Sequence, residues 1–99
     1  MSSYLATKLE AFDGRGKGDY MASHDMEDIV SVIDGRPELV EELRSSGDAL
    51  RRYLAKRFRA LLEYERFIDS LPGHLPGDAA SQARLPVVIE RIEAIAGSG

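Results

Sequence analysis

The stretch SSGDALRRYLAKRFRALLE, residues 45–63, carries the strongest helical periodicity in the chain and decides its fold class. Its apolar residues recur mostly three or four positions apart, so that one face of a helix collects Leu50, Tyr53, Leu54, Phe58, Leu61 and Leu62. Either Ser46 or Asp48 can cap the start of this helix, because a short polar side chain accepts a hydrogen bond from the free amides of a first turn. We expect the helix to run past residue 60 and to form the centre of the core.

Weaker helical patterns flank this stretch on both sides. They predict helices over residues 3–13, from Ser23 or Asp25 to Gly35, after Pro37 and after Asp78. The apolar pattern continues with a shifted phase over residues 64–71, which predicts either a break near Glu63 or a bend followed by one or two further turns. Gly14 is expected to end the first helix, the segment 72–77 to form a turn-rich connector, and Pro86 to interrupt the last helix with a kink or a fresh start. The sequence has no alternating apolar and polar run of useful length, so no strand is predicted. The sequence therefore indicates an all-α fold, a small irregular bundle of about five helices in one domain over residues 1–99.

The composition is that of a globular protein: 99 residues, 43% of them apolar and 30% charged. The absence of cysteine excludes disulfides, thiolate nucleophiles and cysteine-based zinc sites, and it agrees with a reducing compartment. No apolar run approaches the roughly 20 residues that cross a bilayer, and the first residues lack the order of a signal peptide. We therefore expect a cytoplasmic protein without a membrane partner. The net charge of −4 argues against nucleic-acid binding by the surface as a whole.

Charged residues are densest around a glycine-rich segment, GRGKG at residues 14–18, which is typical of an exposed loop. They comprise Lys8, Arg15, Lys17, Asp19, His24, Asp25 and Asp28. The spacing lets Asp25 and Asp28, or His24 and Asp28, share a helix face and converge on one ligand or cation. Acidic residues also favour the first turn of a helix because of its dipole, so a capped helix start with solvated charges explains the same pattern without a ligand.

The order of these residues resembles the C-terminal helical part of nucleotidyltransferases of the AbiEii/AbiGii toxin type. That family carries a lysine on a helix with an alanine nearby, then an arginine, and later a basic residue before D-x-x-D and an aliphatic residue. The matching positions here are Lys8, Ala11, Arg15, Asp25, Asp28 and Ile29. This sequence departs from the pattern in a longer segment between Arg15 and Asp25, and in His24, which stands where the family has Lys or Arg. The segments IDGRPELVEEL and LPGHLPGDAASQARLP extend the resemblance over nearly the whole chain.

The resemblance implies a helical accessory or substrate-binding part of a nucleotidyltransferase-like protein. It makes Lys8, Asp25 and Asp28 the candidate catalytic residues, and we take Arg15 and Lys17 as the candidate cofactor-binding residues. Cationic side chains can neutralise triphosphate oxygens, while an ordered carboxylate orients them or acts on an acceptor hydroxyl.

One half of the family's chemistry is missing from the sequence. Family members hold their metal-binding carboxylates on an N-terminal sheet after a Gly-Ser or Gly-Gly turn, as an acidic pair with one residue between, and this chain has no such arrangement. We therefore expect it to bind no metal or cofactor alone and to be inactive alone. With a separate N-terminal catalytic half as partner, the completed site is expected to use Mg²⁺ and a nucleoside triphosphate.

Another class of function is open as well. Five basic residues fall within residues 51–59: Arg51, Arg52, Lys56, Arg57 and Arg59. One interpretation is an antitoxin-like module that uses these residues to contact protein or nucleic acid. The other is a solvated helix face whose charges pair with Glu63 or with the acidic third helix. A chain that lacks its catalytic half would expose an apolar patch, which favours a partner or a homo-oligomer. His74, in a proline-rich turn, is expected to be a loop or packing residue rather than a catalyst.

Overall fold

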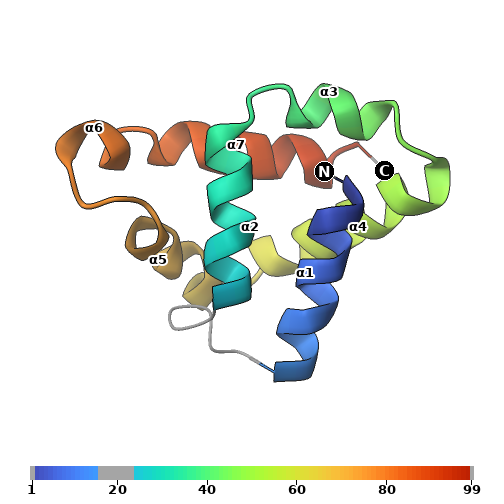
Figure 1. Cartoon of the computed structure of the whole chain (residues 1–99), viewed down its shortest axis with the longest axis horizontal. Coiled ribbons are helices and arrows are strands. Elements are labelled where there is room, and N and C mark those ends of the chain that lie inside the picture. The colour runs from blue at the N-terminus through green and yellow to red at the C-terminus, as the bar shows by residue number, and fades with distance from the viewer. Residues whose placement is uncertain (1, 16–23, 99) are drawn as a thin grey trace.

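The structure is a computed structural model that describes residues 2–15 and 24–98 (Figure 1). In these ranges the chain forms seven helical segments and no strand, so the predicted all-α fold is confirmed. The segments are α1 (Ser2–Arg15), α2 (His24–Gly35), α3 (Leu39–Arg44), α4 (Asp48–Leu62), α5 (Glu65–His74), α6 (Ala79–Gln82) and α7 (Leu85–Ala96). None of the described helices has both the length and the apolar character that crossing a bilayer requires.

The number of segments exceeds the expected five or so for two reasons. Of the break and the bend predicted near Glu63, the structure has the break: α4 ends before Glu63 and Tyr64, and a separate helix α5 follows. The region after Asp78 divides into the single turn α6 and the longer α7. Pro86 lies in the first turn of α7, where its missing amide hydrogen costs no intrahelical bond, and the expected fresh start is thus confirmed.

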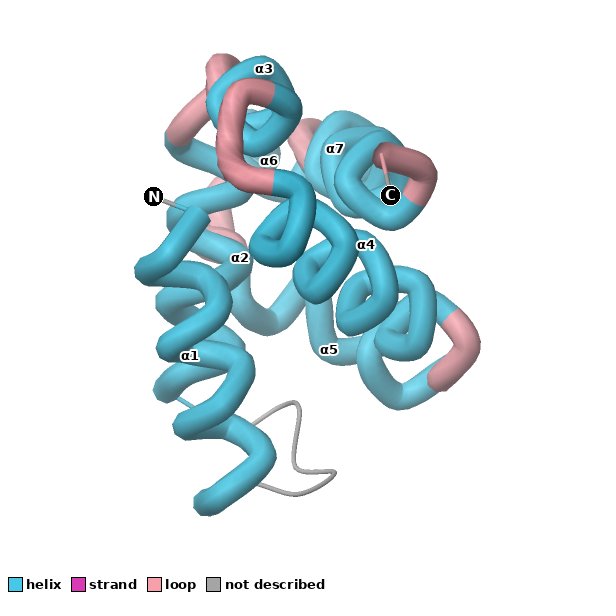
Figure 2. Tube along the Cα trace, turned by 90° about the vertical axis from the view of Figure 1, so that its right-hand side faces the viewer, coloured by secondary structure: helices cyan, strands magenta, loops and turns pink. Residues whose placement is uncertain are grey.

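Helix α4 lies in the middle of the molecule, between α1, α5 and α7 (Figure 2). Its predicted apolar face is the buried one: Leu54, Phe58 and Leu61 are buried, and Leu50, Tyr53 and Leu62 are partly buried against the core. Helices α1 and α2 lie side by side and run across the direction of α7 (Figure 1). Buried residues from these helices and from α3 and α5 join one hydrophobic cluster.

The prediction that Ser46 or Asp48 caps the start of α4 is wrong. The helix begins at Asp48 with Gly47 at its N-cap, and no side chain accepts a hydrogen bond from its first turn. The Ser46 hydroxyl instead donates to the Glu42 carbonyl, 3.1 Å away, and so satisfies a carbonyl of α3. Ser46 therefore serves the end of one helix and not the start of the next.

The boundaries around the glycine-rich segment also differ from the expectation. Helix α1 continues through Gly14 to Arg15, because a glycine costs a helix only about 1 kcal/mol and does not forbid it. Helix α2 begins at His24, which places Asp25 inside its first turn and not at its cap. Ser23, the other expected cap, lies outside the described residues.

The predicted connector after residue 71 begins later than expected. Helix α5 runs through Pro72 and Gly73 to His74, and a proline this close to a helix end removes only one backbone bond. Burial of Leu71 and His74 holds the last turn against the core, and the Gln82 side chain donates to the Pro72 carbonyl at 2.9 Å. His74 is thus a buried helix residue and not part of a loop.

Candidate functional site

Lys8 lies beside the buried face of α1 and next to α2. Leu5, Leu9 and Phe12 of the same helix are buried, and their packing sets the rotation of α1 against the core. This rotation leaves a quarter of the Lys8 side chain exposed, 25%. The Lys8 ammonium is therefore held along the α1–α2 contact.

The structure brings the three candidate catalytic residues together. Lys8 Nζ lies 2.8 Å from Asp28 Oδ2 and 3.6 Å from Asp25 Oδ1. We refer to these three residues as the Lys8 cluster. The candidate cofactor-binding residues are not placed, since the side chain of Arg15 and the whole of Lys17 lie outside the described residues.

The two carboxylates of the Lys8 cluster differ in exposure. The Asp25 side chain is 11% exposed, and it lies in the first turn of α2, where the helix dipole stabilises a negative charge. The Asp28 side chain is 44% exposed, and among the described residues Lys8 is its ion-pair partner. The cluster thus combines one ammonium with two carboxylates, of which only Asp28 is readily reached from solvent.

The environment of Lys8 favours its charged form. Its hydrogen bond to Asp28 raises the pKa of the Lys8 ammonium above its ordinary value, against the opposing effect of desolvation, and the charge of Asp25 adds to the rise. The Tyr4 ring centroid lies 5.6 Å from Lys8 Nζ, within the range of a cation–π contact. Lys8 is therefore a fully charged lysine that is already engaged by three neighbours.

The His24 side chain forms no ion pair with the Lys8 cluster. Its side chain is 95% exposed, and its Nδ1 lies 3.6 Å from Glu27 Oε2, so the possible pairing of His24 with Asp28 is not formed. Across residues 2–15 and 24–98, no three His, Asp or Glu side chains are grouped so that they could hold a metal ion. In the Lys8 cluster the ammonium already bridges the two carboxylates. The described residues therefore do not fit a Mg²⁺ site.

Three of the five basic residues at positions 51–59 of α4 have polar partners within the chain, two of them in α4 itself. Arg51 pairs with the Asp48 carboxylate at 3.0 Å, Arg57 donates to the Tyr53 hydroxyl at 3.1 Å, and Arg59 donates to the Ala96 carbonyl at 3.0 Å. On the acidic helix α3, Glu41 and Glu42 pair with Arg44 and Arg36. Arg52 and Lys56 are exposed and have no partner among the described residues.

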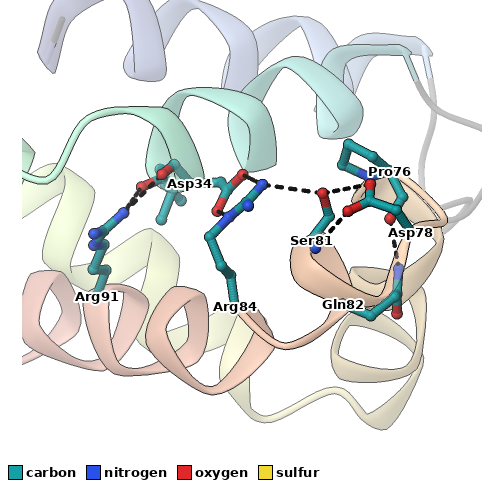
Figure 3. Close-up of polar contacts among 8 residues, drawn as sticks. Asp34, Pro76, Asp78, Ser81, Gln82, Arg84 and Arg91 are labelled. Carbon is teal, nitrogen blue, oxygen red and sulfur yellow. Dashed lines mark hydrogen bonds and ion pairs between the residues drawn. The ribbon is translucent and has the colours of Figure 1, made fainter.

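A second polar network, which sequence spacing did not indicate, joins the end of α2 to α6 and α7 (Figure 3). The Arg84 guanidinium donates to both oxygens of Asp34, at 2.8 and 3.0 Å, and this hydrogen bonding lowers the pKa of the Asp34 carboxyl. Arg91 Nη1 donates to the carbonyls of Ile33 and Asp34, at 2.8 and 2.9 Å. The network closes the C-terminal end of α2, so we interpret it as a structural anchor.

No protein-family model matches this chain, and comparisons with curated proteins and with solved structures also gave no match. A function is therefore inferred from the geometry of the Lys8 cluster and from the resemblance in the order of its residues.

Proposed function

We propose that this chain is the helical accessory part of a nucleotidyltransferase-like protein and that its Lys8 cluster binds the substrates of nucleotidyl transfer. The supporting observation is the 2.8 Å contact between Lys8 Nζ and Asp28 Oδ2. It joins α1 and α2 through the lysine and one of the aspartates that carry the resemblance. Residues on either side of the glycine-rich segment therefore share one polar cluster.

Each group of the cluster suits a step of that reaction. The oxygen of an acceptor hydroxyl forms a bond to the α-phosphorus of a nucleoside triphosphate, the bond to pyrophosphate breaks, and the hydroxyl proton leaves. Asp28, the more exposed carboxylate, orients the hydroxyl and takes this proton. Lys8 contacts the phosphate oxygens and stabilises the charge of the departing pyrophosphate, while the less exposed Asp25 holds Lys8 in place.

The proposal requires a second, catalytic half. Mg²⁺ neutralises the reacting phosphates in this chemistry, and the described residues supply no site for it. A separate half with its own acidic pair must therefore hold the metal, and the isolated chain is expected to be inactive.

The test is a transfer assay with and without that half. The chain is purified alone and co-expressed with the N-terminal catalytic half of an AbiEii-type nucleotidyltransferase. Transfer is measured as incorporation of label from an α-phosphate-labelled nucleoside triphosphate into RNA or protein acceptors. We expect incorporation only by the pair, and a loss of roughly 10- to 100-fold when the chain carries Lys8→Met or Asp28→Asn.

Arg66→Met is the matched control, because it removes an exposed cation that has no partner among the described residues. Circular dichroism of each variant verifies that the helices are intact. Incorporation by the isolated chain would refute the proposal, and so would equal incorporation by the Lys8→Met and Arg66→Met pairs.

Arg52 and Lys56 support a second candidate, a module that contacts nucleic acid. They lie one helical turn apart on α4 and are both exposed, whereas Arg51, Arg57 and Arg59 are engaged within the chain. Two phosphate contacts predict a salt dependence with a slope of about −2 on a duplex, which is weak binding at physiological salt. If the Arg52→Ala/Lys56→Ala variant loses nucleic-acid binding while Lys8→Met keeps it, the second candidate is favoured.

A further inference from the structure

We infer that the base of the nucleoside triphosphate stacks on the Tyr4 ring while Lys8 contacts the phosphates of the same molecule. This inference rests on the proposed function, and it adds the group that distinguishes a nucleotide from a bare polyphosphate. It follows from the place of Tyr4 on α1, from the exposure of its ring and from the distance between the ring and the Lys8 ammonium.

Tyr4 is an exposed aromatic residue without a role in the core. It is 39% exposed, and it belongs neither to the buried hydrophobic cluster nor to the partly buried residues that pack against that cluster. Its hydroxyl has no hydrogen-bond partner among the described residues. Burial of an aromatic ring stabilises a fold, and here that stabilisation is not used. The core therefore does not require a ring at this position.

The ring lies where a base would bring its phosphates to Lys8. Tyr4 and Lys8 are one helical turn apart on α1 and share a face of the helix, with Lys8 Nζ over the ring, 5.6 Å from its centroid. In a nucleotide only the sugar separates the base from the α-phosphate. A base that stacks on the opposite face of the Tyr4 ring therefore leaves its α-phosphate within reach of Lys8, and Asp28 lies 2.8 Å beyond the ammonium.

Stacking also suits an exposed ring in energy and in specificity. A base on an aromatic side chain gains about tenfold in affinity or more, and every base has a flat face, so the contact selects nucleotides without choosing among them. The described part of the chain exposes three large apolar side chains: Tyr4, Tyr64 and Val87. Of these only Tyr4 contacts Lys8, and the other exposed tyrosine therefore provides a control.

The inference is tested by NMR titration of the isolated full chain with ATP and with tripolyphosphate, two probes of similar charge of which only ATP carries a base. At millimolar concentrations ATP should move the Tyr4 ring protons upfield, because stacked rings shield each other, and tripolyphosphate should not. We expect ATP to bind about tenfold more tightly than tripolyphosphate. This preference should vanish in Tyr4→Leu and persist in Tyr4→Phe, which keeps the ring and loses only the hydroxyl.

Tyr64→Leu is the matched control, since it removes a ring that is 56% exposed and does not contact Lys8, and it should keep the preference. If Tyr4 only held the Lys8 ammonium in place, Tyr4→Leu would weaken the binding of both probes by the same factor, and this result would overturn the inference. Equal affinity of the parent chain for both probes, loss of the preference in Tyr4→Phe, or no binding of either probe would overturn it as well.

A short RNA is the third probe, because an acceptor RNA could also supply a base. If Tyr4→Leu weakens the binding of RNA and leaves the preference for ATP intact, the stacked base belongs to the acceptor and the inference is wrong.

These outcomes are distinct from a failure of the proposed function. Nucleotidyl transfer that does not depend on Lys8 would refute the function, whereas the preference for ATP is measured without the catalytic half. In a working pair, Tyr4→Leu should raise KM for the nucleotide about tenfold and leave kcat nearly unchanged, because stacking holds the substrate and the transition state alike. Transfer that depends on Lys8, with an unchanged KM in Tyr4→Leu, would keep the function and overturn the inference.

Discussion

Replacing Arg91 with methionine should destabilise the fold by removing the cap of α2. Arg91 Nη1 donates to the Ile33 and Asp34 carbonyls at 2.8 and 2.9 Å, and these are among the carbonyls that a helix end leaves without an internal partner. A hydrogen bond from a charged donor contributes about 1.5–3 kcal/mol. A single nitrogen serves both carbonyls in a partly exposed place, so water can replace part of the contact, and we expect the free energy of unfolding to fall by about 1.5 kcal/mol.

Urea unfolding followed by circular dichroism measures this change, and a thermal scan should show a fall in Tm of roughly 6–12 °C. Methionine keeps the apolar stem of Arg91, so that the change reports the guanidinium and not lost packing. The control is Arg52→Met, which removes a cation without a described partner and should change the free energy of unfolding by less than about 0.5 kcal/mol. If the two variants unfold at the same urea concentration, the Arg91 contacts do not cap α2 in solution.

Three further perturbations test the core and the polar contacts. Phe58→Ala removes a fully buried ring from α4 and should cost about 3–5 kcal/mol in urea unfolding; a cost below 1 kcal/mol would show that α4 is not central. Since Arg84 lowers the Asp34 pKa, this pair stabilises the fold above the unfolded pKa of about 4, and the contribution is lost as pH falls through the folded pKa. As pH decreases, the urea concentration at the midpoint of unfolding should therefore fall more steeply for the parent chain than for Asp34→Asn. The same dependence of the midpoint on pH in both proteins would contradict this. Asp78→Ala should speed amide hydrogen exchange at Ser81, whose N–H donates to Asp78 at 3.0 Å, and unchanged exchange would exclude this cap.

The sequence by itself was sufficient for the fold class and for the central helix. Leu54, Phe58 and Leu61 recur with the period of a helix, and that period comes from backbone geometry within a few residues. For the same local reason Asp78 could be recognised as a cap, because the amide that it binds lies three positions later. The Pro72 boundary was wrong, because burial of the last turn of α5 outweighed the local signal of a proline and a glycine.

Only the tertiary structure decided which charges meet. Asp25 and Asp28 share one helix, so their closeness followed from spacing, but the contact of Asp28 with Lys8 depends on how α1 packs against α2. Asp34 and Arg84 lie 50 positions apart, and no pattern in the sequence joins them. A helical repeat tells which side of each helix faces the core, whereas the pairing of polar groups between helices depends on rotations and crossings that the packing of all the helices determines together.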